Sequence, residues 1–205
     1  MCGVTSVLRH RRTRMAGRDP HEEHRSATPL ELLFDLTFVV AFGIAANELA
    51  HYVADRHFLT GIVGFALASF AVAWAWINYS WFASAYDNDD WVMRLATMVQ
   101  MVGVIVVALG LEQMFASIDH GSTLDIDVMV AGYVVMRISM LFLWWRAGRD
   151  DPDRASVCRT YIWTIGVSQA GWVVLALLDL SVVASFAWVA VFLMWLKRRQ
   201  IKETT

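Results

Sequence analysis

The sequence predicts an all-α fold, a polytopic bundle of about six transmembrane helices with the N- and C-termini both in the cytoplasm. Apolar residues make up 58% of the 205 residues, which is above the usual share for soluble domains. Charged residues account for only 18%, and they collect in short clusters between long apolar runs. This layout is typical of a chain that crosses a membrane several times, because each crossing needs its own apolar run.

The order of the elements follows from these runs. Residues 1–28 are hydrophilic and rich in arginine, so they are expected to form a disordered cytoplasmic tail and not a signal peptide. The transmembrane bundle is predicted over residues 29–196, with helices at 30–52, 58–86, 91–115, 128–146, 158–178 and 182–196, followed by a basic cytoplasmic C-terminus at 197–205. The last helix is shorter than the ~20 residues of a perpendicular span. Either Lys197 extends its reach by snorkelling, or the segment is re-entrant.

Arginine and lysine are concentrated in the segments on one side of the predicted bundle and are nearly absent from the loops on the other side. This asymmetry predicts the orientation. The loop at residues 117–127 contains neither residue, and the loop between the first two helices contains only Arg56. The opposite side carries the basic clusters of the tail, of the loop after residue 146 and of the C-terminus: Arg9, Arg11, Arg12, Arg14, Arg18, Arg25, Arg146, Arg149, Arg154, Arg159, Lys197, Arg198, Arg199 and Lys202. We therefore expect that side to be cytoplasmic.

Two blocks of the sequence are similar to a known family. The first, TPLELLFDLTFVVAF, runs from Thr28 to Phe42 and opens the first predicted helix. The second, WINYSWFASAYDNDD, runs from Trp76 to Asp90 and is followed by Arg94 and by QMVG at residues 100–103. These blocks, in this order, resemble the bacterial low temperature requirement A family (LtrA).

The resemblance implies a multi-pass protein of the bacterial plasma (inner) membrane, which supports growth at low temperature. Members of that family are usually longer than this chain and contain a second membrane-embedded half. The expected partners are therefore the lipid bilayer and either a second membrane half or further copies of this chain. No nucleic acid is expected as a partner.

Glu31 and Asp35 form a carboxylate pair at positions i and i+4, at the cytoplasmic start of an apolar span. One interpretation is a proton or cation site in an inner vestibule, because acids inside a membrane are costly and usually functional. The other is a helix start favoured by the helix dipole, with Pro29 at the first position. Arg94 lies at a similar depth in a helix of the same direction, so it is the natural partner of Asp35.

Glu48, Glu112 and Arg137 form a second group of charges. The two acids lie toward the outer ends of the first and third predicted helices, and Arg137 lies near the middle of the fourth. Because an arginine inside a membrane requires compensation, we expect a carboxylate partner for Arg137. The group is then either an ion pair that holds three helices together or an electrostatic gate that contacts an anion.

The acidic turn that contains Asp87, Asp89 and Asp90 lacks the spacing of a calcium loop and its final glutamate. We therefore interpret the turn as a cap for the following helix. We recognise no set of nucleophile, histidine and acid, so we expect no catalytic residue, no metal and no cofactor, and the chain is predicted not to be an enzyme.

The charged residues inside the predicted spans favour transport, or channel-like handling, of a small ion or solute. In the alternative, the chain is a non-catalytic membrane or scaffold component that supports growth in the cold, and its buried charges serve only helix assembly.

Overall fold

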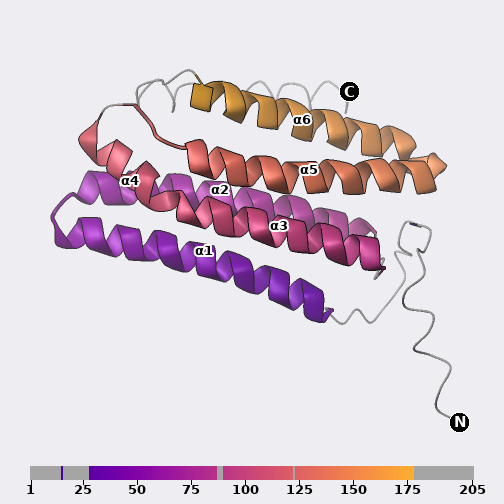
Figure 1. Cartoon of the computed structure of the whole chain (residues 1–205), viewed down its shortest axis with the longest axis horizontal. Helices are drawn as coiled ribbons and strands as arrows, with labels where there is room; N and C mark the ends of the chain where they lie inside the picture. Colours follow the sequence, from indigo (N-terminus) through magenta and orange to yellow (C-terminus); the bar gives the residue numbers. More distant parts are fainter. Residues whose placement is uncertain (1–14, 16–27, 87–89, 122, 178–205) are drawn as a thin grey trace, which may run out of the picture.

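The computed structural model describes Met15 and residues 28–86, 90–121 and 123–177, and these form an antiparallel helical bundle (Figure 1). The helices are α1 (Pro29–Ala54), α2 (Phe58–Ala85), α3 (Trp91–Leu109), α4 (Leu111–His120), α5 (Asp127–Asp150), the short 3-10 helix η2 (Pro152–Arg154) and α6 (Ala155–Leu177). Five segments are long and apolar enough to cross a membrane: α1, α2, α3 with α4, α5, and η2 with α6. The predicted helix at 182–196 and the predicted terminal segments lie outside the described residues, apart from Met15 and Thr28.

Helix α1 begins with a capping box. Thr28 accepts a hydrogen bond from the Glu31 backbone N–H at 3.2 Å, and the Glu31 carboxylate accepts one from the Thr28 N–H at 3.3 Å. Pro29 occupies the first helical position, where no backbone donor is needed. Three residues within four positions therefore fix the start of the first span.

The third predicted helix, residues 91–115, is two helices in the structure. Helix α3 ends at Leu109 and α4 begins at Leu111, with Gly110 as the shared cap. The Gly110 N–H donates a bifurcated hydrogen bond to the carbonyls of Val106 and Val107, at 3.3 and 3.1 Å. The bond to Val107 tightens the helix at that point. Glycine is a weak helix former, so the change from α3 to α4 falls there. Helix α4 then continues into the predicted loop and ends at His120, followed by the capping Gly121, whose φ of 67° is easily adopted by glycine.

Helices α3 and α5 form the most extensive interface of the bundle. Gly132 of α5 lies so close to α3 that a Cβ atom there would be 2.7 Å from the Gly103 carbonyl oxygen and from the Val107 nitrogen. Ser139 adds a hydrogen bond at 2.7 Å to the Ala96 carbonyl across the same interface. Small residues thus let the two backbones approach, as is common between helices in membranes.

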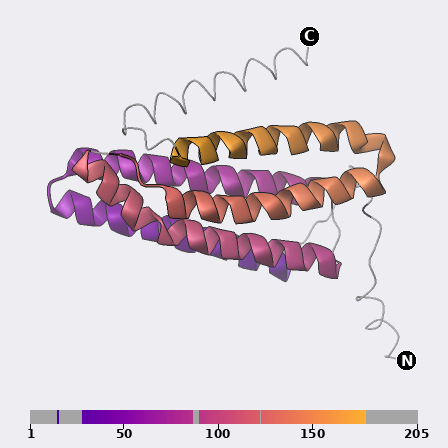
Figure 2. The same cartoon turned by 45° about the horizontal axis from the view of Figure 1, so that its top comes forward.

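The remaining helices flank this central pair. Helix α1 packs on α2 and α3, and α6 packs on α5, so α1 and α6 lie on opposite sides of the bundle (Figure 2). Leu36, Val39 and Val40 of α1 are exposed, as is Leu177 of α6. Exposed apolar side chains on long helices suit a surface that faces lipid hydrocarbon.

Candidate functional site

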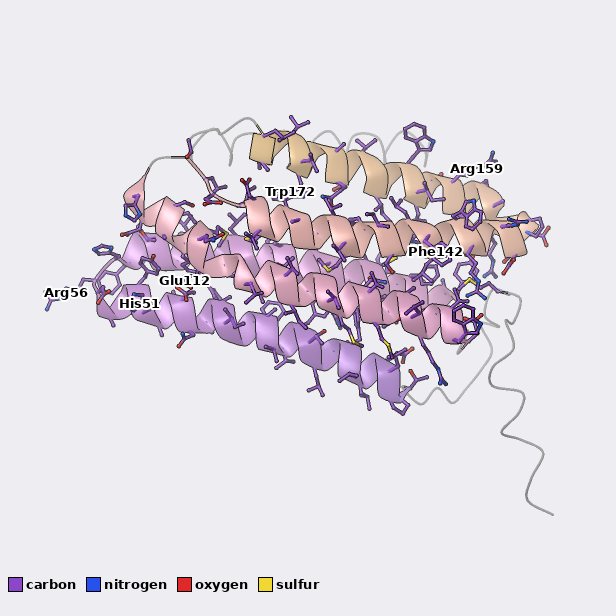
Figure 3. All side chains as sticks on the ribbon, in the orientation of Figure 1. His51, Arg56, Glu112, Phe142, Arg159 and Trp172 are labelled. Atoms are coloured by element: carbon purple, nitrogen blue, oxygen red, sulfur yellow. The ribbon has the colours of Figure 1, made fainter. Side chains whose placement is uncertain are left out.

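The two ends of the bundle differ in charge. Arg149, Arg154 and Arg159 lie at the end where α5 stops and α6 starts, which we call the basic end. His51, Asp55, His57 and Asp119 lie at the other end, which we call the histidine end. Figure 3 shows Arg159 at one end of the bundle and His51, Arg56 and Glu112 toward the other.

A buried ion pair joins α3 to α5 at the basic end. Arg146 Nη1 donates to Asp90 Oδ1 at 2.9 Å, and Nη2 contacts Oδ2, which makes the pair bidentate. The side chains are only 2% and 1% exposed. Asp90 also caps α3, because Oδ1 accepts from the Met93 N–H at 2.9 Å. The predicted cap is therefore confirmed at Asp90, while Asp87 and Asp89 lie outside the described residues.

Further contacts extend this ion pair. Arg146 Nε lies 3.8 Å from Asp150 Oδ2, which in turn accepts the backbone N–H of the fully buried Met15 at 3.3 Å. Met15 is thus held against α5 by Asp150. A buried pair of this kind fixes which helix faces meet, since leaving either charge without its partner is costly.

Aromatic rings close the same end of the bundle. Trp144 stacks on Tyr161 of α6 at 4.2 Å and meets Phe82 of α2 edge-on at 5.0 Å. The Tyr86 hydroxyl and the sulfur of the buried Cys158 form a hydrogen bond of 3.3 Å. Burial raises the pKa of Tyr86, so its phenol stays protonated at physiological pH.

Glu31, Asp35 and Arg94 do not form a single polar group around Asp35. Glu31 belongs to the capping box of α1, as the helix-start interpretation predicted. Asp35 is exposed on the surface of the bundle, and its Oδ1 accepts a hydrogen bond of 2.7 Å from Trp76 Nε1 of α2. The partner that the structure gives Asp35 is therefore Trp76 and not Arg94, which is half-buried on α3. This pairing depends on which face of each helix carries the side chain, and hydropathy does not reveal those faces.

Arg137 is buried in the middle of α5 and is only 5% exposed. Its guanidinium carbon lies 5.4 Å from the centre of the Tyr133 ring, one turn away on the same helix. Tyr133 stacks on Trp172 of α6 at 6.5 Å and donates a hydrogen bond to the Ala71 carbonyl of α2. Arg137 thus lies on the side of α5 that faces α2 and α6.

The predicted pairing of Arg137 with Glu48 and Glu112 is absent among the described residues. Glu48 is half-buried on α1, and Glu112 is exposed on α4. Both acids lie near Tyr52 and Asp119 at the histidine end. Helix α1 packs on α2, α3 and α4, whereas Arg137 faces the α2–α6 side of α5, so Glu48 is directed elsewhere. In the described part of the chain, Arg137 forms no ion pair with any carboxylate.

Other polar groups are buried within the helices without a hydrogen-bond partner among the described residues. They are both amide atoms of Gln169 in α6, the amide nitrogen of Gln100 in α3 and the hydroxyl of Ser69 in α2. A small apolar cavity of about 20 Å³ lies beside Tyr133 and Trp172, and its other lining residues are Leu67, Ala71, Met114, Ile126, Met129 and Val130. The interior therefore contains unpartnered polar groups as well as a wholly apolar cavity.

The histidine end has its own polar contacts. Asp119 of α4 lies 2.6 Å from His57 Nδ1 and accepts from the Thr60 hydroxyl at 3.0 Å, so it ties α4 to the start of α2. His51 and Asp55 form a longer contact of 3.7 Å at the end of α1. Among the described residues no group of three or more histidine, cysteine or acidic side chains is placed to hold a metal ion.

Comparison with known proteins decides the family. The family described as "Bacterial low temperature requirement A protein (LtrA)" matches residues 26–204. The chain belongs to the LtrA family. An uncharacterised protein of Rhizobium meliloti (strain 1021), RA0937, is 29% identical over 137 residues, which cover 66% of this chain and 31% of that protein. The match to this LtrA-family chain thus spans about a third of the relative's length. No solved structure matches.

Sequence reasoning on this LtrA-family chain missed three of the residues described above. Arg146 is predicted only as one of the cytoplasmic basic residues, and its spacing from Arg149, three residues on and on nearly the same helix face, does not distinguish the two. Trp76 is the first residue of the second family-like block, and nothing in the sequence indicated a contact with Asp35. Gln169 gave the clearest missed signal, because an amide in an apolar span requires a partner.

Proposed function

We propose that this LtrA-family chain is a non-enzymatic protein of the bacterial plasma membrane that moves a small ion or solute across the bilayer. The observation that carries the proposal is Arg137, a cation that is 5% exposed in the middle of a candidate span. A buried charge that has no counter-charge among the described residues does not stabilise the fold. Stability therefore does not explain the presence of Arg137. Ionisable residues in such positions usually mark ion or substrate pathways.

The proposed orientation places the basic end in the cytoplasm. It rests on the excess of arginine and lysine at one end of the helices, where Arg149, Arg154 and Arg159 lie. With a sixth span at 182–196, both termini would be cytoplasmic. Single cysteines at Arg154 and at Thr123, each in a background without native cysteines, test this with an impermeant thiol reagent in whole cells. The reagent should label position 123 only; labelling of position 154 alone would reverse the orientation.

Flux into proteoliposomes tests the transport proposal. The purified chain should conduct at least one small ion in a panel of sodium, potassium, proton and chloride gradients, and Arg137→Gln should abolish that flux. Asp35→Asn tests the surface carboxylate in the same assay. Arg149→Gln is the matched control, because Arg149 lies on the same helix, 5.7 Å from the Trp145 ring, but is exposed. Equal flux in the wild type and in Arg137→Gln would reject the role of Arg137.

A second candidate function is a non-catalytic scaffold that supports growth in the cold. The Asp90–Arg146 pair and the Glu31 capping box favour it, since all three charges have structural partners. In that case an apolar replacement of the pair, Asp90→Leu with Arg146→Met, should preserve cold growth as long as the chain still assembles. Loss of cold growth by Arg137→Gln at normal protein levels would favour transport instead.

A further inference from the structure

We propose that Arg137 binds a small monovalent inorganic anion in the layer between α5 and α6, reached through the apolar cavity beside Tyr133 and Trp172. The inference deepens the proposed function, because it names the charge and class of the ion at the same arginine. It starts from the absence of any ion pair to Arg137 among the described residues. The Tyr133 ring at 5.4 Å offers the guanidinium a weakly attractive face but no hydrogen-bond acceptor for its N–H groups.

The helix register brings a second unpartnered group to the same layer. Tyr133 and Trp172 stack at 6.5 Å across antiparallel helices. Arg137 follows Tyr133 by one turn toward the basic end, and Gln169 precedes Trp172 by about one turn in the same direction. Both therefore lie on the same side of the stack, at the α5–α6 interface. Both amide atoms of Gln169 are buried without a partner among the described residues, so its Nε2 is available to donate.

These donors fit an anion. Guanidinium and amide N–H groups both donate hydrogen bonds, and the guanidinium carries the positive charge that excludes cations. Neither group can be deprotonated or oxidised under physiological conditions, so the site would bind without chemical change.

The adjoining cavity, as the proposed access route, favours a small ion. About 20 Å³ exceeds the ~10–15 Å³ needed for one water molecule, and the walls are apolar. Phosphate and sulfate would lose far more hydration than a singly charged halide on entering such walls. Tyr133 and Trp172 line the cavity, and the Arg137 guanidinium lies over the Tyr133 ring, so we expect side-chain motion of this ring pair to connect the cavity with Arg137. Figure 3 shows Trp172 on the α5 side of α6.

Anion-dependent stability of the full chain in detergent tests the proposal. Sodium chloride is exchanged for sodium gluconate at constant ionic strength, and Tm is followed by circular dichroism. A bound anion should raise Tm in a saturable manner with chloride and not with gluconate. Arg137→Gln should weaken the apparent chloride affinity by about tenfold to a hundredfold, as expected for the loss of a charge-assisted hydrogen bond. Gln169→Leu should weaken it by a smaller factor, and Arg149→Gln should leave it unchanged.

Several outcomes would overturn the anion site. They are a wild-type chain without a saturable chloride effect, an equal effect of gluconate, and unchanged chloride affinity in Arg137→Gln. If Arg137→Gln does not fold, the chloride titrations of the wild type and of Gln169→Leu still decide whether the anion site exists. Chloride binding without flux of any ion would support the anion site and reject transport. Flux that is carried by cations, together with no chloride effect on Tm, would support transport and reject the anion site.

Discussion

Arg146 and Asp90 are joined by a bidentate, almost fully buried ion pair that connects the last turns of α5 to the first residue before α3. The Asp90 carboxylate also caps α3. One side chain therefore fixes the start of α3 and holds the neighbouring helix α5 against it. Because the α3 and α5 backbones also approach closely at Gly132, the two helices form the centre of the bundle, with α1 packed on α3 and α6 packed on α5.

Asp90→Ala should be among the most destabilising single changes in the chain, because it leaves a buried guanidinium without its carboxylate. We expect a loss of about 3–5 kcal/mol in the free energy of unfolding. The free energy of unfolding is measured by titrating the protein in mixed micelles with a denaturing detergent. Asp119→Asn is the comparison, since Asp119 and His57 form an exposed contact, and its effect should be clearly smaller. Equal effects of the two changes would argue against a structural role for the buried pair.

Gly132→Ala should force α3 and α5 apart, since the new methyl group would lie 2.7 Å from backbone atoms of Gly103 and Val107. The expected cost is about 1–3 kcal/mol, typical of overpacking. Gly43→Ala is the control, because a Cβ atom there meets nothing within 4 Å on the exposed side of α1. That change should be neutral or stabilising, up to about 1 kcal/mol. The same detergent titration distinguishes the two, and a tolerated Gly132→Ala would contradict the close approach.

Trp76→Phe should loosen α1 from α2 modestly, because it removes the donor that reaches Asp35. A single hydrogen bond at this exposed position contributes at most about 1.5 kcal/mol. Combining Trp76→Phe with Asp35→Ala should add little to either single change if the two side chains interact only with each other. Additive losses of stability in that cycle would mean that Asp35 is coupled to another group, with Arg94 as the first to test by the charge swap Asp35→Arg with Arg94→Asp.

Cys158 should resist thiol reagents in the folded protein, because its side chain is fully buried against Tyr86 and Gly148. In a Cys2→Ser background, a maleimide should label it at least about tenfold more slowly in mild detergent than after denaturation, since reaction requires local opening. Mass spectrometry of quenched samples gives both rates. Rapid labelling of the folded chain would show that α6 separates readily from α2 and α5.

The sequence alone determined the features that depend on local composition and on neighbouring residues. Apolar runs predicted the five described spans to within a few residues, because each crossing needs its own length of hydrocarbon-compatible chain. Pro29 and Glu31 indicated the start of α1, and the acidic turn that ends at Asp90 indicated that of α3, because the signals of a helix start come from residues close in the chain.

The tertiary structure decided which faces of those helices meet, and with them the partners of the buried charges. Membrane helices are apolar on most sides, so hydropathy does not show whether Asp35 faces Trp76 or Arg94, or whether Arg137 faces Glu48 or Tyr133. Small residues such as Gly132 and the Arg146–Asp90 pair set those faces by permitting one close approach and making others costly. The same packing buries Arg137 and leaves both amide atoms of Gln169 without a described partner, and the anion experiments test whether the two form one site.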